Sequence, residues 1–353
     1  MLPGLASLLE PQLLIDALLA RSALPSLSSA RVCYIKYKPG TNCLVGYQLH
    51  TGGVWVNAYA RALRRDDYAR LHDQPANGCI RIDAQALELR LFPADRRLPR
   101  LRLLAEPVRQ QGLLKRLFPE KPDWWQGQLE CLAYKPERRY VARLIVDQSP
   151  VAVLKFHTSH GYAAAWRAAL STQGHTNLAN LIGQSEHDHV LAYAWLEGRV
   201  ASAALLDETW PITGCIQIGA ALAALHTQPA SGLCVRQHSA EIEAVHAAGH
   251  AVVVLCPQLA PHIQALCNKL SIHLNTMPTT QGLIHGDFYA RQVLLQDSGV
   301  VLIDLDEAAY ADQLLDLANI LAHIEYDVLA GVLRRERADL ALLELCEQRL
   351  WNA

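Results

Sequence analysis

The most constraining feature of this chain is a group of polar residues set between short apolar runs near its C-terminal end. His285 and Asp287 are separated by a single glycine, and the amide Gln292 follows Asp287 by five positions. Asp304 comes directly after another apolar run, with Asp306 two positions further on. We predict that the runs are buried strands and that the polar residues stand at their ends. The expected strands are residues 282–284, 292–296 and 299–303, with a turn at 297–299.

Carboxylate and amide side chains in this order suit phosphoryl transfer. That reaction asks a protein mainly to position the reactants and to neutralise the charge of the phosphates. Asp287 is the candidate for facing an acceptor hydroxyl. Mg²⁺ takes oxygen ligands and is usually held by one or two carboxylates together with phosphates, which suits Asp304 and the amide oxygen of Gln292. The pattern therefore indicates a phosphotransferase.

The same segment resembles the catalytic loop of the aminoglycoside phosphotransferase and choline kinase family, which has a protein-kinase-like fold. That family carries H-G-D-x-x-x-x-N, then I-D-x-x, then G-D-P-x-x-D-L-A at the start of a helix. Here the last motif is residues 311–319, where the glycine and proline are missing but Asp312 and Asp316 remain. Over roughly residues 125–350, the resemblance implies ATP and Mg²⁺ as cofactors and a small hydroxyl compound as acceptor. The implied site residues are Asp287 and His285 in catalysis, and Gln292, Asp304 and Asp306 at the metal.

Two upstream segments resemble the nucleotide-binding lobe of the same family. Lys155 lies in the apolar strand 150–156, like the lysine of V-A-I-K strands that contacts the α- and β-phosphates. Residues 189–199 resemble the crossing between the lobes, whose backbone faces adenine. A hairpin with a basic tip stands where kinases have a glycine-rich loop, and its side chains are expected either over the phosphates or in solvent. The implied nucleotide-binding residues are Lys155, Arg138, Arg139, Ala192, Tyr193, Ala194 and Trp195.

Two departures from the family pattern bear on activity. Gln292 stands where most members have asparagine, and we interpret it as a variant metal ligand with one more methylene. The segment 158–185 contains no Asp or Glu, so the helix after Lys155 offers no glutamate of the kind that kinases pair with this lysine. Another carboxylate could substitute, the phosphates could position the lysine, or the activity could be weak. The rival hypothesis is therefore a weak or inactive pseudokinase that binds nucleotide or acts as a scaffold.

The N-terminal third of the chain carries an echo of the nucleotide-binding lobe. The tripeptide Tyr-Lys-Pro at 37–39 recurs at 134–136, an offset of 97 residues (134 − 37 = 97), and residues 31–59 read as a second hairpin and third strand. At the same offset Ala58 takes the place of Lys155, so we expect no nucleotide in this copy. The expected domains are an accessory N-terminal domain at 1–118, a nucleotide-binding lobe and hinge at 119–196 that begins with a linker at 119–125, and a helical lobe with the catalytic loop at 197–353.

Composition points to a cytoplasmic protein without a nucleic-acid or membrane partner. The chain has 353 residues, more than one core usually fills, and a formal net charge of −2. Nine cysteines without a C-x-x-C pair indicate reduced thiols. Glu10 and Asp16 interrupt the apolar stretch 8–19 and no basic region precedes it, so we expect no signal peptide there. Buried or lobe helices are expected within residues 209–235 and at 240–250, 261–275, 316–323 and 329–351.

These expectations combine into one fold and one activity. The predicted fold is α+β and two-lobed, protein-kinase-like, with a β-rich first lobe, an α-rich second lobe and an extra β-containing domain in front. The predicted activity is transfer of the γ-phosphate of ATP to a hydroxyl of a sugar, amino-alcohol or aminoglycoside-like acceptor. The sequence does not indicate an oligomeric state.

Overall fold

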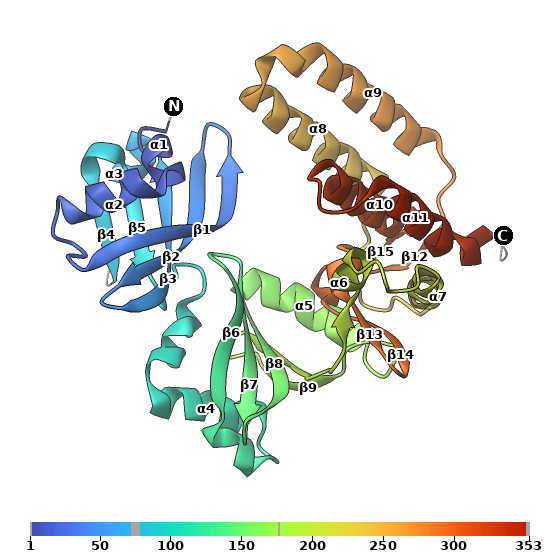
Figure 1. Cartoon of the computed structure of the whole chain (residues 1–353), viewed down its shortest axis with the longest axis horizontal. Coiled ribbons are helices and arrows are strands. Elements are labelled where there is room, and N and C mark those ends of the chain that lie inside the picture. The colour runs from blue at the N-terminus through green and yellow to red at the C-terminus, as the bar shows by residue number, and fades with distance from the viewer. Residues whose placement is uncertain (1, 72–77, 176, 351–353) are drawn as a thin grey trace. The chain divides into compact units, whose positions relative to one another are not determined.

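The computed structural model describes residues 2–71, 78–175 and 177–350. It divides into two compact units, which are described one at a time. The first unit contains Met1–Ser159, Gly183–Ala192 and His250–Gln258, and the second contains the remainder. The first unit is built on two β-sheets, and the second is mostly helical (Figure 1).

The first sheet takes its core from apolar strand residues and from two short N-terminal helices. Its elements are α1 (Leu5–Leu9), α2 (Pro11–Leu19), β1 (Leu27–Lys38), β2 (Asn42–Thr51), β3 (Val54–Leu63), α3 (Arg65–Ala69), β4 (Cys79–Ile82), η1 (Asp83–Gln85) and β5 (Leu87–Leu91). Pro11 begins α2, where its missing N–H costs no helical hydrogen bond. Leu8 and Leu14 are fully buried in one core with Tyr47 of β2. The strand order is β1-β2-β3-β5-β4.

The second sheet repeats this strand order. Its strands are β6 (Gln128–Lys135), β7 (Arg139–Val146), β8 (Ser149–His157), β9 (Leu181–Ser185) and β10 (Val190–Ala194). They are arranged β6-β7-β8-β10-β9, so in both sheets the fifth strand lies between the third and the fourth. The chain also enters a helix after the third strand in both cases, α3 in the first and α5 (Ser159–Ser171) in the second. The structural repeat is therefore larger than the predicted hairpin and third strand, because it includes all five strands of the sheet.

The first hairpins of the two sheets have the same register. Tyr37 of β1 pairs with Cys43 of β2. At the offset of 97 residues, Tyr134 of β6 pairs with Tyr140 of β7. The predicted correspondence of these two hairpins is therefore confirmed residue by residue at their tips.

The third strands, β3 and β8, are not related by the offset of 97 residues. Leu44 pairs with Arg61 in the first sheet, whereas its counterpart Val141 pairs with Lys155 in the second. The path between the paired residues is three residues longer in the first sheet, 17 positions (61 − 44) against 14 (155 − 141). The prediction that Ala58 takes the place of Lys155 was wrong, because it assumed no gap. Arg61 takes that place, and each of the two residues is buried with 8% exposure.

The segment that joins the two sheets is packed. It contains η2 (Pro99–Ala105), α4 (Pro107–Leu117) and η3 (Pro122–Gln126). The indole N–H of Trp125 donates to the carbonyl of Phe118 at 2.9 Å, and the Phe118 ring lies 5.0 Å from that of Trp124. Residues 119–125, where the sequence predicted a linker, thus form a compact turn.

The second unit packs helices around two small antiparallel sheets. Its helices are α6 (Ala201–Leu206), α7 (Gly214–His226), α8 (His238–Leu255), η4 (Pro257–Leu259), α9 (Ala260–Thr276), α10 (Leu314–Leu329) and α11 (Arg335–Leu350), although the end of α8 and most of η4 are assigned to the first unit. Its strands and remaining turns are β11 (Arg199–Val200), β12 (Gln281–Ile284), η5 (Ala290–Gln292), β13 (Val293–Gln296), β14 (Gly299–Leu302), η6 (Leu305–Glu307) and β15 (Ala309–Asp312). One sheet has the order β11-β13-β14, and the other pairs β12 with β15. A Cβ at Gly219 of α7 would lie 2.4 Å from the carbonyl oxygen of Leu345, so glycine lets α7 and α11 pack closely.

Most of the predicted elements of this unit are confirmed. The three strands predicted around the catalytic loop are β12, β13 and β14, and α8, α9 and α10 include the helices predicted at 240–250, 261–275 and 316–323. The stretch 209–235 contains α7, and the helix predicted there is partly buried: Leu222 and Leu225 are buried, whereas Ile216 and Ala220 at the same helical spacing are half-buried. The last helix begins at Arg335, six residues later than predicted, and Trp351 lies outside the described residues.

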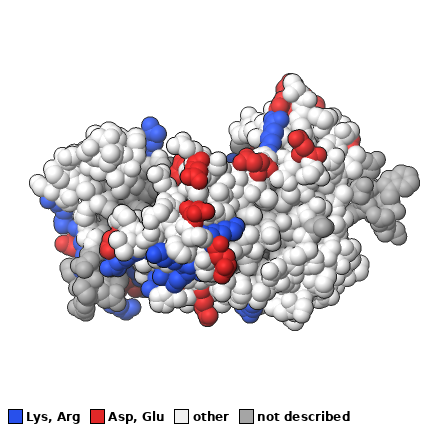
Figure 2. Space-filling view, turned by 90° about the horizontal axis from the view of Figure 1, so that it is seen from below, with Lys and Arg blue, Asp and Glu red and all other residues white. Residues whose placement is uncertain are grey.

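Basic and acidic side chains lie next to one another on the face in Figure 2, and broad areas carry neither. Within the described ranges, no helix combines the length and the apolar character that crossing a bilayer requires.

Candidate active site

The predicted catalytic loop lies between β12 and β13, and its glycine is required by the backbone. Gly286 has φ +83°, a left-handed conformation that favours glycine. A Cβ at this position would lie 2.1 Å from the carbonyl oxygen of Glu307. The single glycine between His285 and Asp287 therefore lets the loop turn tightly beside η6.

A buried carboxylate on α10 holds the loop. Asp316 is fully buried, and its two oxygens accept the backbone N–H groups of His285 at 2.8 Å and Gly286 at 2.9 Å. The same carboxylate accepts a hydrogen bond from Nε2 of His226 at 2.9 Å. Three donors satisfy this buried charge, as burial of a carboxylate demands. Asp316 thus fixes the backbone that precedes Asp287.

His285 ties the loop to the strand that carries Asp304. The residue is fully buried, and its Nε2–H donates to the carbonyl of Ile303 at 2.8 Å. Its ring lies 5.7 Å from that of buried Phe288. These contacts give His285 a supporting position in the loop, while the neighbouring Asp287 is only half-buried.

The predicted metal ligands Gln292 and Asp304 lie side by side. Nε2 of Gln292 donates to Oδ2 of Asp304 at 3.3 Å, and Gln292 is buried with 6% exposure. Asp304 has φ +66°, a left-handed conformation that aspartate tolerates better than most residues and that recurs at functional sites. Asp306 follows in η6 and is half-buried. One carboxylate, one amide and a second nearby carboxylate fit an oxygen-preferring cation that also binds phosphates.

Within the described ranges, no cluster of potential metal ligands competes with Gln292 and Asp304. Among the residues that the structure describes, no three His, Cys, Asp or Glu side chains come together in a way that could hold a metal ion. A magnesium site built on Gln292 and Asp304 would therefore depend on phosphate oxygens for its remaining ligands.

The predicted nucleotide-binding residues lie mainly in the first unit. Lys155 is buried in β8, opposite Val141. Arg138 is exposed at the tip of the β6–β7 hairpin, and Arg139 begins β7. The role of these two arginines towards phosphates stays a prediction.

The predicted hinge is the end of β10. Ala192 is fully buried, and the N–H of Ala194 donates to the carbonyl of Asn180 at 2.9 Å. The indole N–H of Trp195 donates to the carboxylate of Glu197 at 2.7 Å. The backbone N–H of Ala194 is thus already used within the protein.

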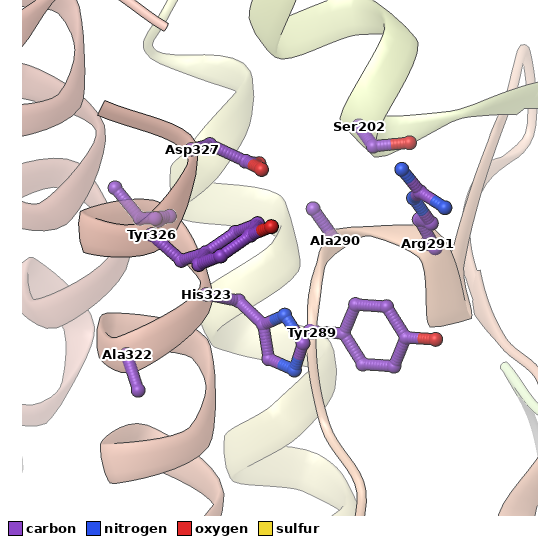
Figure 3. Close-up of a pocket in the computed structure, with 9 residues that line it drawn as sticks. Ser202, Tyr289, Ala290, Arg291, Ala322, His323, Tyr326 and Asp327 are labelled. Carbon is purple, nitrogen blue, oxygen red and sulfur yellow. The ribbon is translucent and has the colours of Figure 1, made fainter. Parts of the chain in front are cut away.

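A cavity of about 570 Å³ opens beside the catalytic loop in the second unit. The rings of Tyr289 and His323 stack there, with centroids 4.2 Å apart and planes inclined by 15°. Figure 3 shows the Asp327 side chain on one side of Ala290 and Arg291 on the other. The described lining residues are Ser202, Tyr289, Ala290, Arg291, Ala322, His323, Ile324, Tyr326 and Asp327.

Sequence reasoning did not find the helical wall of this cavity. Tyr289, Ala290 and Arg291 lie within the recognised loop, but His323 and Asp327 come from α10. Asp327 follows Asp316 by 11 positions (327 − 316), three helical turns, which puts both on one face of α10. Because Asp316 had already been matched to the family motif, this helical spacing could have predicted that Asp327 faces the same side of the helix.

Comparisons with known proteins show the family of this chain. The profile of the Phosphotransferase enzyme family matches residues 131–344. This is more than half of the chain, which therefore belongs to that family. A search of curated proteins finds no match.

Solved structures of kinases are similar in fold. A choline kinase of Cryptosporidium parvum is 12% identical, with a TM-score of 0.50 over 68% of this chain and 78% of its own. A choline/ethanolamine kinase family protein of Mesorhizobium loti is 16% identical, with a TM-score of 0.49 over 67% and 74%. An aminoglycoside phosphotransferase of Streptomyces rimosus is 18% identical, with a TM-score of 0.43 over 66% and 96%. The chain has an α+β kinase-like fold, with the first sheet as an extra N-terminal region.

Proposed function

We propose that this protein transfers the γ-phosphate of ATP to a hydroxyl group of a small polar molecule. The observation that carries the proposal is the catalytic loop, where Asp316 fixes the backbone of His285 and Gly286 immediately before Asp287. Phosphoryl transfer depends on positioned charges more than on covalent chemistry, so a rigidly held carboxylate is the feature to expect.

Asp287 is the group that orients the acceptor hydroxyl and takes its proton. It is half-buried, so a substrate can reach it, while His285 and Asp316 behind it are buried. His285 acts through its hydrogen bond to Ile303, which holds the loop against the strand that leads to Asp304. Asp316 acts through the backbone of the same loop.

Gln292 and Asp304 are the proposed metal-binding residues, with Asp306 close by. Mg²⁺ held there would neutralise charge on the phosphates during transfer. Nε2 of Gln292 faces Asp304, and its amide oxygen makes no hydrogen bond within the described part of the chain. That oxygen is therefore available as a ligand, as the amide of the usual asparagine would be.

Lys155, Arg138 and Arg139 are the proposed contacts to the phosphates, and Ala192–Trp195 the proposed adenine-facing segment. The position of Lys155 supports this role, because the residue is buried in the middle of β8, the strand that resembles the V-A-I-K strand of kinases. The N–H of Ala194 is bonded to Asn180, so adenine would have to use other backbone groups of the segment.

The cavity beside the loop is the proposed acceptor site. It combines the stacked Tyr289 and His323 rings with one carboxylate, Asp327, and one guanidinium, Arg291. A polycationic antibiotic would need several acids, and Asp327 is the single acid among the described lining residues. Aromatic faces with mixed polar groups favour a sugar or an amino-alcohol.

A panel of acceptors tests the proposal. Sugars, amino-alcohols and aminoglycosides are each incubated with Mg-ATP, and addition of a phosphate is read by mass spectrometry. We expect wild-type protein to modify at least one sugar or amino-alcohol, and the Asp287→Asn variant to modify none at a comparable rate. Nucleotide binding without transfer to any acceptor would instead support the pseudokinase hypothesis.

A further inference from the structure

The place that corresponds to the nucleotide lysine in the first sheet is occupied by part of the second sheet. Arg61, the counterpart of Lys155, donates from Nη1 to Oε1 of Glu137 at 3.3 Å. Glu137 lies at the tip of the β6–β7 hairpin and has φ +57°. Both side chains are nearly buried, with 10% exposure for Arg61 and 11% for Glu137.

Glu137 has further donors in the first sheet and in the loop that follows it. Oε1 also accepts from Nε of Arg96 at 3.2 Å and from the hydroxyl of Tyr59 at 3.4 Å. The Tyr59 hydroxyl in turn accepts the backbone N–H of Arg96 at 3.0 Å. A carboxylate with two guanidinium groups and a hydroxyl around it is a well-compensated buried charge.

Asp95 of the first repeat also forms hydrogen bonds with the hairpin tip. It follows β5, the strand that corresponds to β10 and its hinge, and only 3% of the residue is exposed. Its Oδ2 accepts the backbone N–H of Glu137 and the hydroxyl of Tyr134, each at 2.8 Å. Its Oδ1 accepts the N–H groups of Arg97 and Leu98 at 2.8 and 2.9 Å. Burial and the neighbouring Asp95 raise the pKa of Tyr134, so this hydroxyl remains a donor.

A row of aromatic rings connects the loop after β5 with β8, the strand that carries Lys155. Phe92 stacks on Tyr140 with centroids 5.2 Å apart, and Tyr140 meets Phe156 edge-on at 5.7 Å. Phe156 is the neighbour of Lys155 in β8. The tip, the aromatic rings and the lysine strand are thus parts of one packed region in the first unit.

We propose that the first sheet is an internal clamp on the β6–β7 tip, and that Glu137 and Asp95 are positioning residues for nucleotide binding. Arg61, at the position equivalent to Lys155, binds the carboxylate of Glu137. Asp95, in the segment equivalent to the hinge, binds the backbone N–H of Glu137. The first copy therefore binds a piece of the same chain in place of a nucleotide. This inference rests on the proposed function, in which the tip and Lys155 face the phosphates.

The composition of the tip explains why a clamp is needed. Residues 134–140 contain no glycine, and Pro136 is buried against the first sheet, where a Cβ on Gly46 would lie 3.3 Å from its ring. A glycine-rich loop adapts to phosphates by its own flexibility. A stiff tip must instead be held in position before the nucleotide arrives, which lowers the ordering cost of binding.

The test compares hairpin variants of the full chain. Glu137→Ala removes the clamp contact, and Glu137→Gln keeps an acceptor oxygen for Arg61. Glu130→Gln is the matched control, since Glu130 and Arg143 form an exposed ion pair on the same hairpin, 53% and 34% exposed. Calorimetry with Mg-ADP gives the dissociation constant and the number of sites, and hydrogen exchange reports protection of the amides at 134–140.

The clamp makes a graded prediction. Glu137→Ala should weaken Mg-ADP binding roughly tenfold, as expected for loss of a buried charge-assisted contact, and should increase exchange at the tip. Glu137→Gln should recover most of the affinity, and Glu130→Gln should match wild type. Glu137→Ala should also melt at a lower temperature, because it leaves the buried Arg61 without its carboxylate, so all affinities are measured well below that temperature. Each chain should bind one nucleotide.

Several outcomes would overturn the clamp. Wild-type affinity in Glu137→Ala despite faster exchange would make the contact purely structural, and unchanged exchange would show that the tip is not held there. A second nucleotide per chain would also contradict it, because the first copy would then have an open site. Absence of Mg-ADP binding to wild type would refute the proposed function itself along with the clamp, so the two failures are distinguishable.

Discussion

The two sheets of the first unit share one topology and differ in chemistry. Both have the order first, second, third, fifth, fourth, and the tips of their first hairpins have the same register. Their third strands carry a buried cation at the same position, Arg61 in one and Lys155 in the other. Arg61 binds Glu137 from the other sheet, so a repeated backbone does not imply a repeated ligand. In our proposals the two cations differ in role because they differ in partner: Arg61 binds an internal carboxylate, and Lys155 binds the phosphates of the nucleotide.

The chain after each sheet differs as well. The first sheet leads into η2 and α4, whereas the second leads into the helical unit with the catalytic loop. One repeat is therefore followed by a short connecting helix, and the other by the helical unit that contains Asp287, Gln292 and Asp304. The comparison predicts that turnover depends on the second copy and that the first copy acts through it.

The largest expected effect is at Asp287, for which the first sheet has no counterpart segment. Asp287→Asn keeps the shape of the side chain but removes the proton acceptor, so turnover should fall by roughly 10²–10⁴-fold. Nucleotide affinity should change little. Steady-state kinetics and calorimetry with Mg-ADP measure the two quantities. Normal turnover in this variant would remove Asp287 from the mechanism.

Reciprocal exchange of the two buried cations should give unequal effects. Lys155→Arg puts a planar guanidinium where a compact ammonium is expected at the phosphates, so kcat/KM for ATP should fall about 10²-fold. Arg61→Lys keeps the charge beside Glu137 and should lower kcat/KM by less than about tenfold. Melting curves of both variants control for folding. Equal losses would indicate that the two sheets have equivalent roles.

A smaller effect is expected at Gln292. Gln292→Leu removes the amide oxygen at similar bulk and should raise the Mg²⁺ requirement while lowering turnover by about tenfold. Gln292→Asn should recover part of the activity, because its oxygen is one methylene short. Rates measured across a magnesium titration separate these outcomes. Wild-type metal dependence in the leucine variant would mean that the amide is not a ligand and would strengthen the pseudokinase hypothesis.

The smallest effect concerns the attachment of α4, the helix that joins the two sheets. Asp188, just before β10, is 1% exposed and accepts from Arg116 of α4 at 2.8 Å and from Ser185 at 2.7 Å. Burial raises the pKa of Asp188, but these hydrogen bonds outweigh burial and leave it below the ordinary value. Asp188→Asn should lower the free energy of unfolding by about 1–3 kcal/mol at neutral pH.

The pH dependence of that loss has a definite sign. Because the pKa is lower in the folded state, the charged Asp188 stabilises the fold above the unfolded value of about 4, and the benefit disappears as the pH falls through the folded value. The gap between wild-type and variant melting temperatures should thus narrow below about pH 4. A constant gap between pH 3 and pH 7 would contradict this assignment of the stabilising charge.

Local patterns in the sequence predicted much of this fold. Apolar runs bounded by turn residues placed β12, β13 and β14, and the motif between them placed the catalytic loop. The recurrence at 37–39 and 134–136 predicted the tips of two matching hairpins. These features succeeded because a strand, a turn and a short loop are specified by neighbouring residues.

The sequence by itself thus determined the family motif, the strands around it and the existence of a repeat. Only the tertiary structure decided that Arg61 stands opposite Lys155 in that repeat, because strand register depends on pairing and a three-residue difference leaves no local trace. It also decided that Asp316 holds the backbone of the loop and that Glu137 lies between Arg61 and Asp95. Contacts between residues tens of positions apart are set by packing, so their partners could not be read from the chain.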